Sequence, residues 1–279
     1  MEWKIGKFLV RLAIKDYFSL DAGILFSGIP KEKWINWCRY PFYLDEQNRV
    51  RISVNCFLIK SDQGKSVLVD TSFGNTNLWK ENTVKAFDMK NGFNLFKEGL
   101  PHPDFIIPTH LHFDHAGGFV EKTEENLVPA FPGSRYLIHN DEIRHAFSVH
   151  PKTRSSYLRE TIEGVRLISE NRLLAGIISG RFELLPGLTI IKTRGHTPGH
   201  VSIKIQSEGK TAFIPGALFP TRFHSLTACG VGNDTHALEA ANHKIRFMRQ
   251  AAKKNWLFLM EHDHAIAGFI TAYEGIRIP

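Results

Sequence analysis

The stretch THLHFDHAGG, residues 109–118, places three histidines and one aspartate within six positions. His110 and His112 are separated by one residue, so in an extended chain both side chains point to the same side and can bind one ion. Asp114 and His115 follow a bend that lets them face a second point nearby. Because this H-x-H-x-D-H pattern comes directly after an apolar run, it predicts a metal site rather than a histidine-rich surface loop.

Five short apolar runs along the chain end in residues of the candidate site. They read SVLVD (66–70), DFIIPTH (104–110), LTIIKTRGH (188–196), TAFIPGA (211–217) and WLFLMEH (256–262). Such runs, rich in Val, Ile, Leu and Phe, are typical of strands that are buried on both faces. Ligand sites in sheets of this kind lie beyond the C-terminal ends of the strands. We therefore expect the five ends to meet at one sheet edge, where Asp70 and His196 would join the histidine cluster.

The segments between these runs predict helices. Asp234 is an acceptable N-cap for the stretch 235–254, in which apolar residues recur at three- and four-residue spacing. Further helices are expected near residues 77–90, 141–149 and 155–163. The last two fall in a basic segment that could lie over a pocket. The N-terminal part predicts strands around residues 8–14 and 53–59.

Composition and charge indicate a globular chain and argue against several classes of partner. With 279 residues, 43% hydrophobic and 23% charged, the chain can bury a substantial core. The formal net charge is +7, yet the sequence has no Lys/Arg run or basic stripe, so we expect no nucleic-acid partner. No stretch reaches the ~18 apolar residues of a spanning helix, so no membrane association is expected. Cys38, Cys56 and Cys229 form no C-x-x-C pair, which favours a reduced, cytoplasmic protein.

The motif HLHFDHAGG with a downstream GHTPGH resembles the metallo-β-lactamase-fold hydrolase superfamily, and the likeness extends from VLVDTSFG to MEHDH. More narrowly, DAGILFSGIPKEKW and ALFPTRFH resemble the branch that contains the quorum-quenching N-acyl-homoserine lactonases. The resemblance implies an α/β (α+β) fold, the four-layer αββα sandwich, with two metal ions at one edge. We expect a single domain over residues 1–279, in two pseudo-symmetric halves of approximately 1–165 and 166–279.

The resemblance also implies two sets of three metal ligands. The first metal would be held by His110, His112 and His196. The second metal would be held by Asp114, His115 and His262. His264 competes for the last position, but His262 comes first after the strand and forms the His-Asp pair usual in the family. Zinc is the expected metal, with one or two ions, although imidazole and carboxylate ligands also suit iron, manganese and cobalt. Asp70 and His200 are expected to support the ligands without binding metal.

Ala217 departs from the family pattern. In the family an aspartate normally follows the glycine of FIPG and bridges both ions, whereas this chain has a methyl group there. Because a methyl group cannot bind a metal, the second site should be weaker. Three explanations stay open: a substitution made to disable the enzyme, a natural variant with one tight and one loose metal, or a homologue that has lost catalysis.

The expected activity is hydrolysis of a lactone or ester that carries an apolar chain. A zinc-like ion held by neutral imidazoles lowers the pKa of its water towards ~7, and the resulting hydroxide would attack the carbonyl carbon. Asp114 would pass a proton to the leaving group, and His224 in PTRFH is a candidate for binding the substrate's oxygen. Some aromatic residues close to the motifs could form an apolar pocket for an acyl chain, although each taken singly is more typical of the core: Phe26, Trp34, Phe73, Phe113, Phe119, Phe219 and Phe223.

Two rival functions remain. A phosphotriester or phosphodiester hydrolase would use the same site, and the positive net charge mildly favours an anionic substrate. A non-catalytic metal-binding or ligand-binding homologue is an alternative because of Ala217. The partner is expected to be a small-molecule substrate, and a homodimer is one alternative for the assembly.

Overall fold

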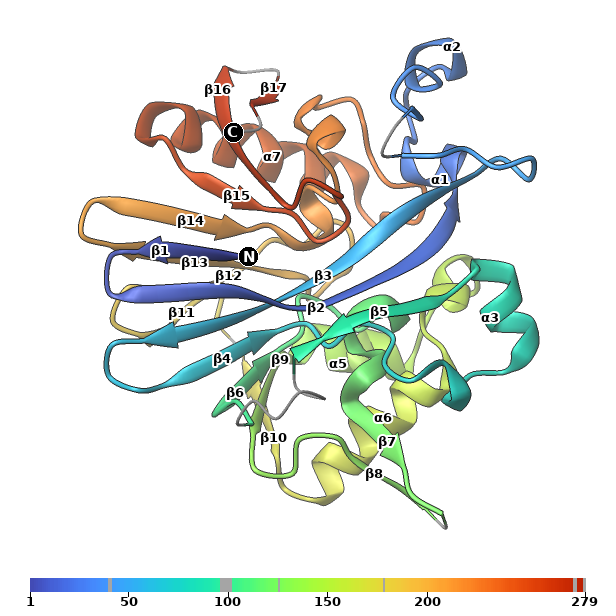
Figure 1. The fold of residues 1–279 in the computed structure, drawn as a ribbon, viewed down its shortest axis with the longest axis vertical. Coiled ribbons are helices and arrows are strands. Elements are labelled where there is room, and N and C mark those ends of the chain that lie inside the picture. The colour runs from blue at the N-terminus through green and yellow to red at the C-terminus, as the bar shows by residue number, and fades with distance from the viewer. Residues whose placement is uncertain (40–41, 96–101, 125, 178, 273–274, 278–279) are drawn as a thin grey trace.

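The computed structural model describes residues 1–39, 42–95, 102–124, 126–177, 179–272 and 275–277. Two β-sheets pack face to face (Figure 1). The first has the order β1-β2-β3-β4-β6-β9-β10, and β5 pairs with β2. Its strands are β1 (Glu2–Ile5), β2 (Phe8–Asp21), β3 (Arg49–Ser61), β4 (Ser66–Val69), β5 (Lys90–Asn94), β6 (Phe105–Ile107), β9 (Arg135–His139) and β10 (Leu174–Ile177). Because β4, β6, β9 and β10 pair in parallel, their C-terminal ends lie at the same edge.

The second sheet follows the order of the chain from β11 to β17. Its strands are β11 (Arg181–Leu185), β12 (Leu188–Lys192), β13 (Val201–Ser207), β14 (Lys210–Ile214), β15 (Leu257–Leu259), β16 (Ala267–Ala272) and β17 (Gly275–Arg277). The parallel pair β14 and β15 is joined by the long helix α7 (Ala237–Lys254). A separate hairpin is formed by β7 (Val120–Lys122) and β8 (Leu127–Pro129).

Short helices connect the strands and carry many of the site residues. The α-helices besides α7 are α1 (Ala22–Leu25), α2 (Lys31–Trp34), α3 (Glu81–Phe87), α4 (Phe113–Ala116), α5 (Asn140–Phe147) and α6 (Arg159–Glu170). The 3₁₀ helices are η1 (Thr76–Leu78), η3 (Gly117–Phe119), η4 (Pro151–Ser156), η5 (Gly216–Leu218) and η6 (Arg222–Ser225). None of the helices described is both long enough and apolar enough to cross a lipid bilayer.

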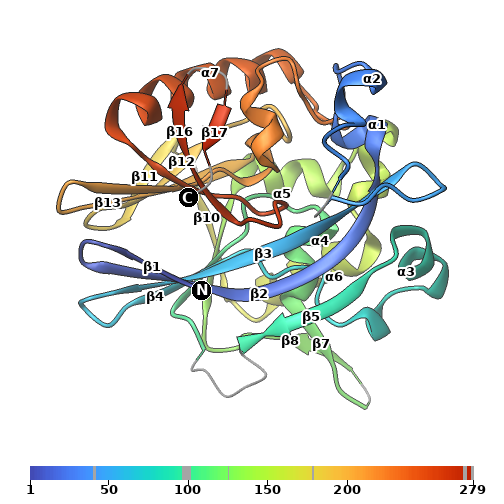
Figure 2. The ribbon, with the colours of Figure 1, turned by 45° about the horizontal axis from the view of Figure 1, so that its top comes forward.

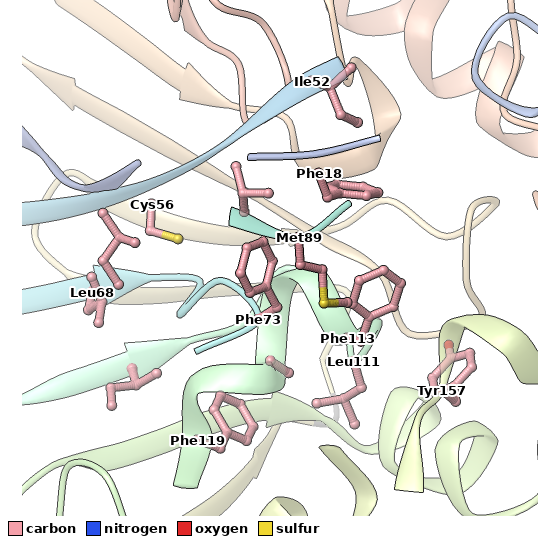
Figure 3. Packing of buried hydrophobic residues seen from close by; sticks show 14 of the residues in the cluster. Phe18, Ile52, Cys56, Leu68, Phe73, Met89, Leu111, Phe113, Phe119 and Tyr157 are labelled. Carbon is pink, nitrogen blue, oxygen red and sulfur yellow. The ribbon is translucent and has the colours of Figure 1, made fainter. Parts of the chain in front are cut away.

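Three layers of buried apolar side chains separate four layers of secondary structure. Between the two sheets lie side chains such as Val10, Phe57, Ile203 and Ile214. The outer face of the first sheet packs on α6 through residues such as Leu68, Ile138, Val165 and Ile168 (Figure 3 shows part of this cluster). Helix α7 covers the outer face of the second sheet (Figure 2). Phe213, Met248 and Trp256 pack together between them. The structure therefore confirms the predicted αββα sandwich.

Several predicted boundaries shift in the structure. Strand β2 continues to Asp21 instead of ending near residue 14, because it pairs with β3 along almost its whole length. Helix α7 begins at Ala237, later than Asp234 suggested, because the amides of Thr235 and His236 donate to carbonyls of the loop around Gly195. The last strand of the first sheet is β10 (Leu174–Ile177), so this sheet extends past residue 165. The pseudo-symmetry of the two halves stays a prediction.

Candidate metal centre

The ends of β6, β12, β14 and β15 converge on one cavity of about 240 Å³. The end of β4 lies behind it, where Asp70 contacts His115. Its lining includes all six predicted metal ligands together with Ala217. The six side chains are buried, and each follows a strand or opens a short helix at this edge. The strand-end pattern in the sequence thus correctly predicted where these residues meet.

His110, His112 and His196 form one compact group, which we call the three-histidine group. One ring nitrogen from each lies within 4.8 Å of the others. His196 Nε2 is 3.1 Å from His112 Nδ1, close to the separation of about 3.3 Å between two nitrogens that bind one tetrahedral ion at ~2.0–2.1 Å. The buried His110 Nε2 has no hydrogen-bond partner in the part of the chain that the structure describes. These donors fit a divalent ion.

Asp114, His115 and His262 form a second group, which we call the aspartate group. The Nε2 atoms of His115 and His262 are 3.2 Å apart, and Asp114 Oδ2 lies 3.4 Å from each. His264 lies outside this group, because its Nε2 donates to the Arg51 carbonyl at 2.9 Å and its ring stacks on Tyr17. Of the two competing histidines, the structure brings His262 to the candidate ligands.

Each group is oriented by acceptors behind its histidines. Asp234 Oδ1 lies 2.7 Å from His196 Nδ1, and Asp70 Oδ2 lies 2.8 Å from His115 Nδ1. Nδ1 of His262 is 2.9 Å from the carbonyl oxygen of Ser53. When Nδ1 donates to such an acceptor, the lone pair of Nε2 faces the ligand group. The contact with His115 fits the supporting role predicted for Asp70, which also accepts the backbone N–H of Thr109 at 2.6 Å.

Asp234 lies behind a candidate metal ligand, a place that sequence reasoning did not give it. Its position before an amphipathic stretch suggested a helix cap, but its carboxylate holds His196 and accepts the Val231 amide at 3.2 Å. Burial alone would raise the pKa of Asp234, yet the hydrogen bond from His196 lowers it overall. The glycine-rich sequence around it, residues 230–234, was the available signal, since such a segment can approach a neighbouring loop closely.

The two groups differ in protonation. Burial, reinforced by the neighbouring histidines, holds the pKa values of His110 and His112 well below the usual range. Burial would also lower the pKa of His115, but the carboxylates of Asp114 and Asp70 outweigh it and raise that pKa well above the usual value. For His262, burial dominates and lowers the pKa to about 4. Without a metal, the three-histidine group therefore has neutral rings at His110 and His112, whereas the aspartate group contains a protonated His115.

Ala217 lies in η5 and lines the cavity beside both groups. Glu261 and Asp263 flank His262 in sequence and could supply the carboxylate that position 217 lacks. Neither residue lines the cavity. The Asp263 carboxylate accepts Nε of Arg222 at 2.8 Å. The Glu261 carboxylate is buried against Asp70 and His115 and does not line the cavity.

His224 does not join the candidate site. Its ring is buried in η6, with Nδ1 2.9 Å from Thr221 Oγ1 and Nε2 2.8 Å from the carbonyl oxygen of Leu25. With both ring nitrogens engaged, His224 has none left to bind a substrate's oxygen. The capping interaction of η6 and the backbone of α1 explain why this histidine turns inward.

The apolar wall of the cavity differs from the predicted one. Among the seven aromatic residues that were candidates for it, only Phe113 lines the cavity in the described structure. Most of the others are buried in the core. The wall is formed by Phe18 and Leu20 of β2, with Ile52 and Phe87 from neighbouring elements. Phe18 and Phe113 lie edge to face with ring centroids 5.7 Å apart (Figure 3). The extension of β2 beyond its predicted end brings this wall to the site.

A sequence profile described as the metallo-beta-lactamase superfamily matches residues 49–254. The chain belongs to the metallo-β-lactamase superfamily. This confirms the resemblance, and hydrolase chemistry with divalent metals is the chemistry of that superfamily. The N-acyl homoserine lactonase of Bacillus cereus is 29% identical over 175 residues, which are 58% of this chain and 61% of that protein. The N-acyl homoserine lactonase AiiA of Bacillus thuringiensis subsp. kurstaki is 29% identical over 173 residues, 57% of this chain and 60% of that protein.

The alignments therefore span about three fifths of the curated relatives' length. Solved structures of the metallo-β-lactamase fold match over nearly the whole chain. A probable metal-dependent hydrolase from Staphylococcus aureus has a TM-score of 0.86 at 23% identity, covering 98% of this chain and 96% of that one. The dizinc quorum-quenching lactonase AidC, in complex with a product, has a TM-score of 0.75 at 20% identity, covering 99% of this chain and 95% of that one. At these identities the likeness shows the fold.

Proposed function

We propose that this chain hydrolyses a small lactone or ester that carries an apolar chain. The observation that carries this proposal is a cavity lined both by two ligand groups and by apolar side chains. Both are needed for such a substrate, since the ligand groups would bind the reacting carbonyl end and the wall would bind the chain. The curated relatives, which are lactonases, support the same choice.

Zinc is the metal we propose, held by the three-histidine group and, more weakly, by the aspartate group. The residues fit, because the donor atoms converge and their far sides are held by Asp234, Asp70 and Ser53. When bound, a divalent ion would supply a water of lowered pKa and polarise the substrate carbonyl.

The chain's own residues provide the rest of the chemistry. Asp114 lines the cavity as the one carboxylate among the six ligands, so its oxygens are placed to take up a proton and release it to the leaving group. Burial by itself would raise the pKa of Asp114, but His115 and His262 lower that pKa by more than burial raises it. The carboxylate is therefore ionised before it takes up a proton. Phe18, Leu20 and Phe113 would exclude water and receive the apolar chain.

A substrate panel tests the proposal. The panel contains lactones and esters of several chain lengths, a phosphotriester and a phosphodiester. We expect lactone or ester hydrolysis that is lost after chelation and dialysis and is restored by zinc. Faster turnover of the phosphorus esters would favour the rival phosphoryl chemistry. No turnover of any substrate, by this chain or by Ala217→Asp with metal bound, would favour a non-catalytic binding protein.

Assembly and location complete the proposal. We propose a cytoplasmic protein on the basis of its cysteine usage, with a homodimer as the assembly to test. Light scattering on the eluate of a sizing column would test the dimer, because a monomeric mass over a wide concentration range excludes it.

A further inference from the structure

Glu142 of α5 is a buried carboxylate that none of the proposed chemistry uses. It is 1% exposed and accepts four hydrogen bonds. Its Oε1 accepts from the backbone N–H of Leu111 at 3.0 Å and from the Tyr157 hydroxyl at 2.8 Å. Its Oε2 accepts from the Thr197 hydroxyl at 2.5 Å and from the backbone N–H of Gly199 at 3.1 Å. A buried carboxylate with four donors is fully satisfied, which makes its geometry well defined.

Three of the four donors lie on the two loops that carry the three-histidine group. Leu111 lies between His110 and His112 in sequence, so its amide belongs to the first ligand loop. Thr197 and Gly199 follow His196 in the second ligand loop. The two loops belong to different halves of the chain, and the Glu142 carboxylate joins them.

Tyr157 connects the same carboxylate to a ligand ring. Its ring is nearly perpendicular to that of His112, at 82°, with centroids 4.8 Å apart. The hydrogen bond to Glu142 fixes the hydroxyl end of Tyr157, so the aromatic ring is held against His112. Glu142 thus constrains His112 through the backbone on one side and through Tyr157 on the other.

Close backbone contact also fixes α5 against the second ligand loop. A Cβ atom added at Gly199 would lie 2.1 Å from the backbone nitrogen of Glu142, so no side chain fits between them. The loop that carries His196 therefore rests directly on the helix that carries the carboxylate.

We propose that Glu142 is a positioning residue that sets the separation between His196 and the pair His110 and His112. The inference rests on the proposed function in taking the three-histidine group as a metal site. Glu142 itself contacts no ligand ring. By joining the two loops, Glu142 holds His110, His112 and His196 in the arrangement that binds a metal. Metal affinity at the three-histidine group should therefore depend on Glu142, whereas affinity at the aspartate group should not.

Glu142→Gln is a sharp test because it preserves shape and removes one acceptor. Each carboxylate oxygen of Glu142 faces one hydroxyl and one backbone N–H. A hydroxyl can rotate and accept from the new amide, but a backbone N–H cannot. Whichever way the glutamine amide turns, one backbone N–H, at Leu111 or at Gly199, loses its acceptor and its loop is released.

The experiment measures Co²⁺ affinity by chelator competition, with the cobalt absorption spectrum as a second readout. His262→Ala isolates the three-histidine group, and His112→Ala isolates the aspartate group. We expect Glu142→Gln to weaken Co²⁺ binding about 10–100-fold in the first background and to change its spectrum. In the second background we expect little change. Val165→Ala, a buried truncation in α6, is the control for general loss of stability.

Equal weakening in both backgrounds, or a loss matched by Val165→Ala, would overturn the proposal. Unchanged affinity in the His262→Ala background would overturn it too. If Glu142→Gln does not fold, Thr197→Val removes a single donor and should give a smaller loss confined to the three-histidine group. The experiment measures metal affinity and not hydrolysis. If the chain binds metal but hydrolyses no lactone, the proposed function fails while the effect of Glu142→Gln can still be judged.

Discussion

The three-histidine group and the aspartate group lie side by side, yet they differ in charge and in how they are supported. In the first group, all three donors are imidazoles, and the carboxylate of Asp234 lies behind His196. In the second group, one donor is the carboxylate of Asp114, and a second carboxylate, Asp70, lies behind His115. A motif of six residues, completed by His196 and His262, therefore contributes to two sites of unlike electrostatics.

This difference has consequences for metal binding. His110 and His112 are neutral without a metal, so they need no deprotonation before they bind. His115 is held protonated by two carboxylates, so an ion must displace a proton there. The aspartate group also lies next to Ala217, where the superfamily resemblance predicts a bridging carboxylate. We infer that the three-histidine group is the tighter of the two.

Removing one ligand from each group should give the largest difference. We expect His112→Ala to lose the metal that survives dialysis, whereas His262→Ala should mainly reduce the more loosely held second ion. Loss of an outer hydrogen-bond partner commonly lowers metal affinity about 10–100-fold, and loss of a ligand should lower it at least as much. Elemental analysis after dialysis measures both, with His264→Ala as the control histidine outside the groups. Equal metal content in His112→Ala and His262→Ala would contradict the ranking.

Sequence alone predicted the fold and the convergence of the ligands well. The H-x-H-x-D-H motif and the apolar runs are local patterns, and each strand end delivers its own residues to the same edge. The choice of His262 over His264 also followed from position, because the residue nearest the strand end faces the cavity. Local patterns of this kind are visible without knowing what packs against them.

The rest of the site depends on contacts between distant segments, which no local pattern records. Asp234 is 38 positions from His196, and Glu142 is 31 positions from Leu111. Phe18 reaches the cavity only because β2 extends along β3. His224 stands in a motif that resembled a site, but its ring is captured by Thr221 and the backbone of Leu25.

Adding a carboxylate at Ala217 should reduce the difference between the groups. We expect Ala217→Asp to raise metal occupancy towards two ions per chain and to increase lactone hydrolysis, because it supplies an anionic ligand where surrounding residues already frame the space. A gain of about tenfold or more is reasonable by comparison with outer partners. Zinc titration and ring-opening rates measure it, and Ala217→Asn, which adds a neutral side chain of the same size, is the control.

Two outcomes of that experiment would change the comparison. If the aspartate crowds the ions and lowers activity, the site has adapted to a methyl group at this position. If a second ion binds but turnover is unchanged, the metal chemistry is right and the substrate is wrong.

Replacing the carboxylate behind each group should also distinguish the two groups, by a smaller effect than the loss of a ligand. We expect Asp234→Asn to weaken binding at the three-histidine group and Asp70→Asn to weaken it at the aspartate group, each by about 10–100-fold. The reason is that each carboxylate orients one histidine ring through Nδ1. Affinities in the His262→Ala and His112→Ala backgrounds measure the effect. If either substitution weakened both groups alike, the two sites would share their support and the comparison would fail.

The smallest expected difference is a single proton. The folded-state pKa of His115 is raised well above the ordinary value, so at pH 7 the metal-free ring is protonated and binding must release about one proton. His110 and His112 have depressed pKa values and should release none. Affinity at the aspartate group should therefore rise about tenfold per pH unit up to the pKa of His115, while affinity at the three-histidine group should change far less.

Calorimetry at pH 7 in two buffers of unequal ionisation enthalpy counts the protons released on metal binding, with His112→Ala and His262→Ala isolating the groups. Asp70→Asn should lower the count at the aspartate group, because it removes one of the two carboxylates that hold the proton on His115. Equal proton counts for the two groups would mean that Asp70 and Asp114 do not charge His115, and the electrostatic half of the comparison would have to be abandoned.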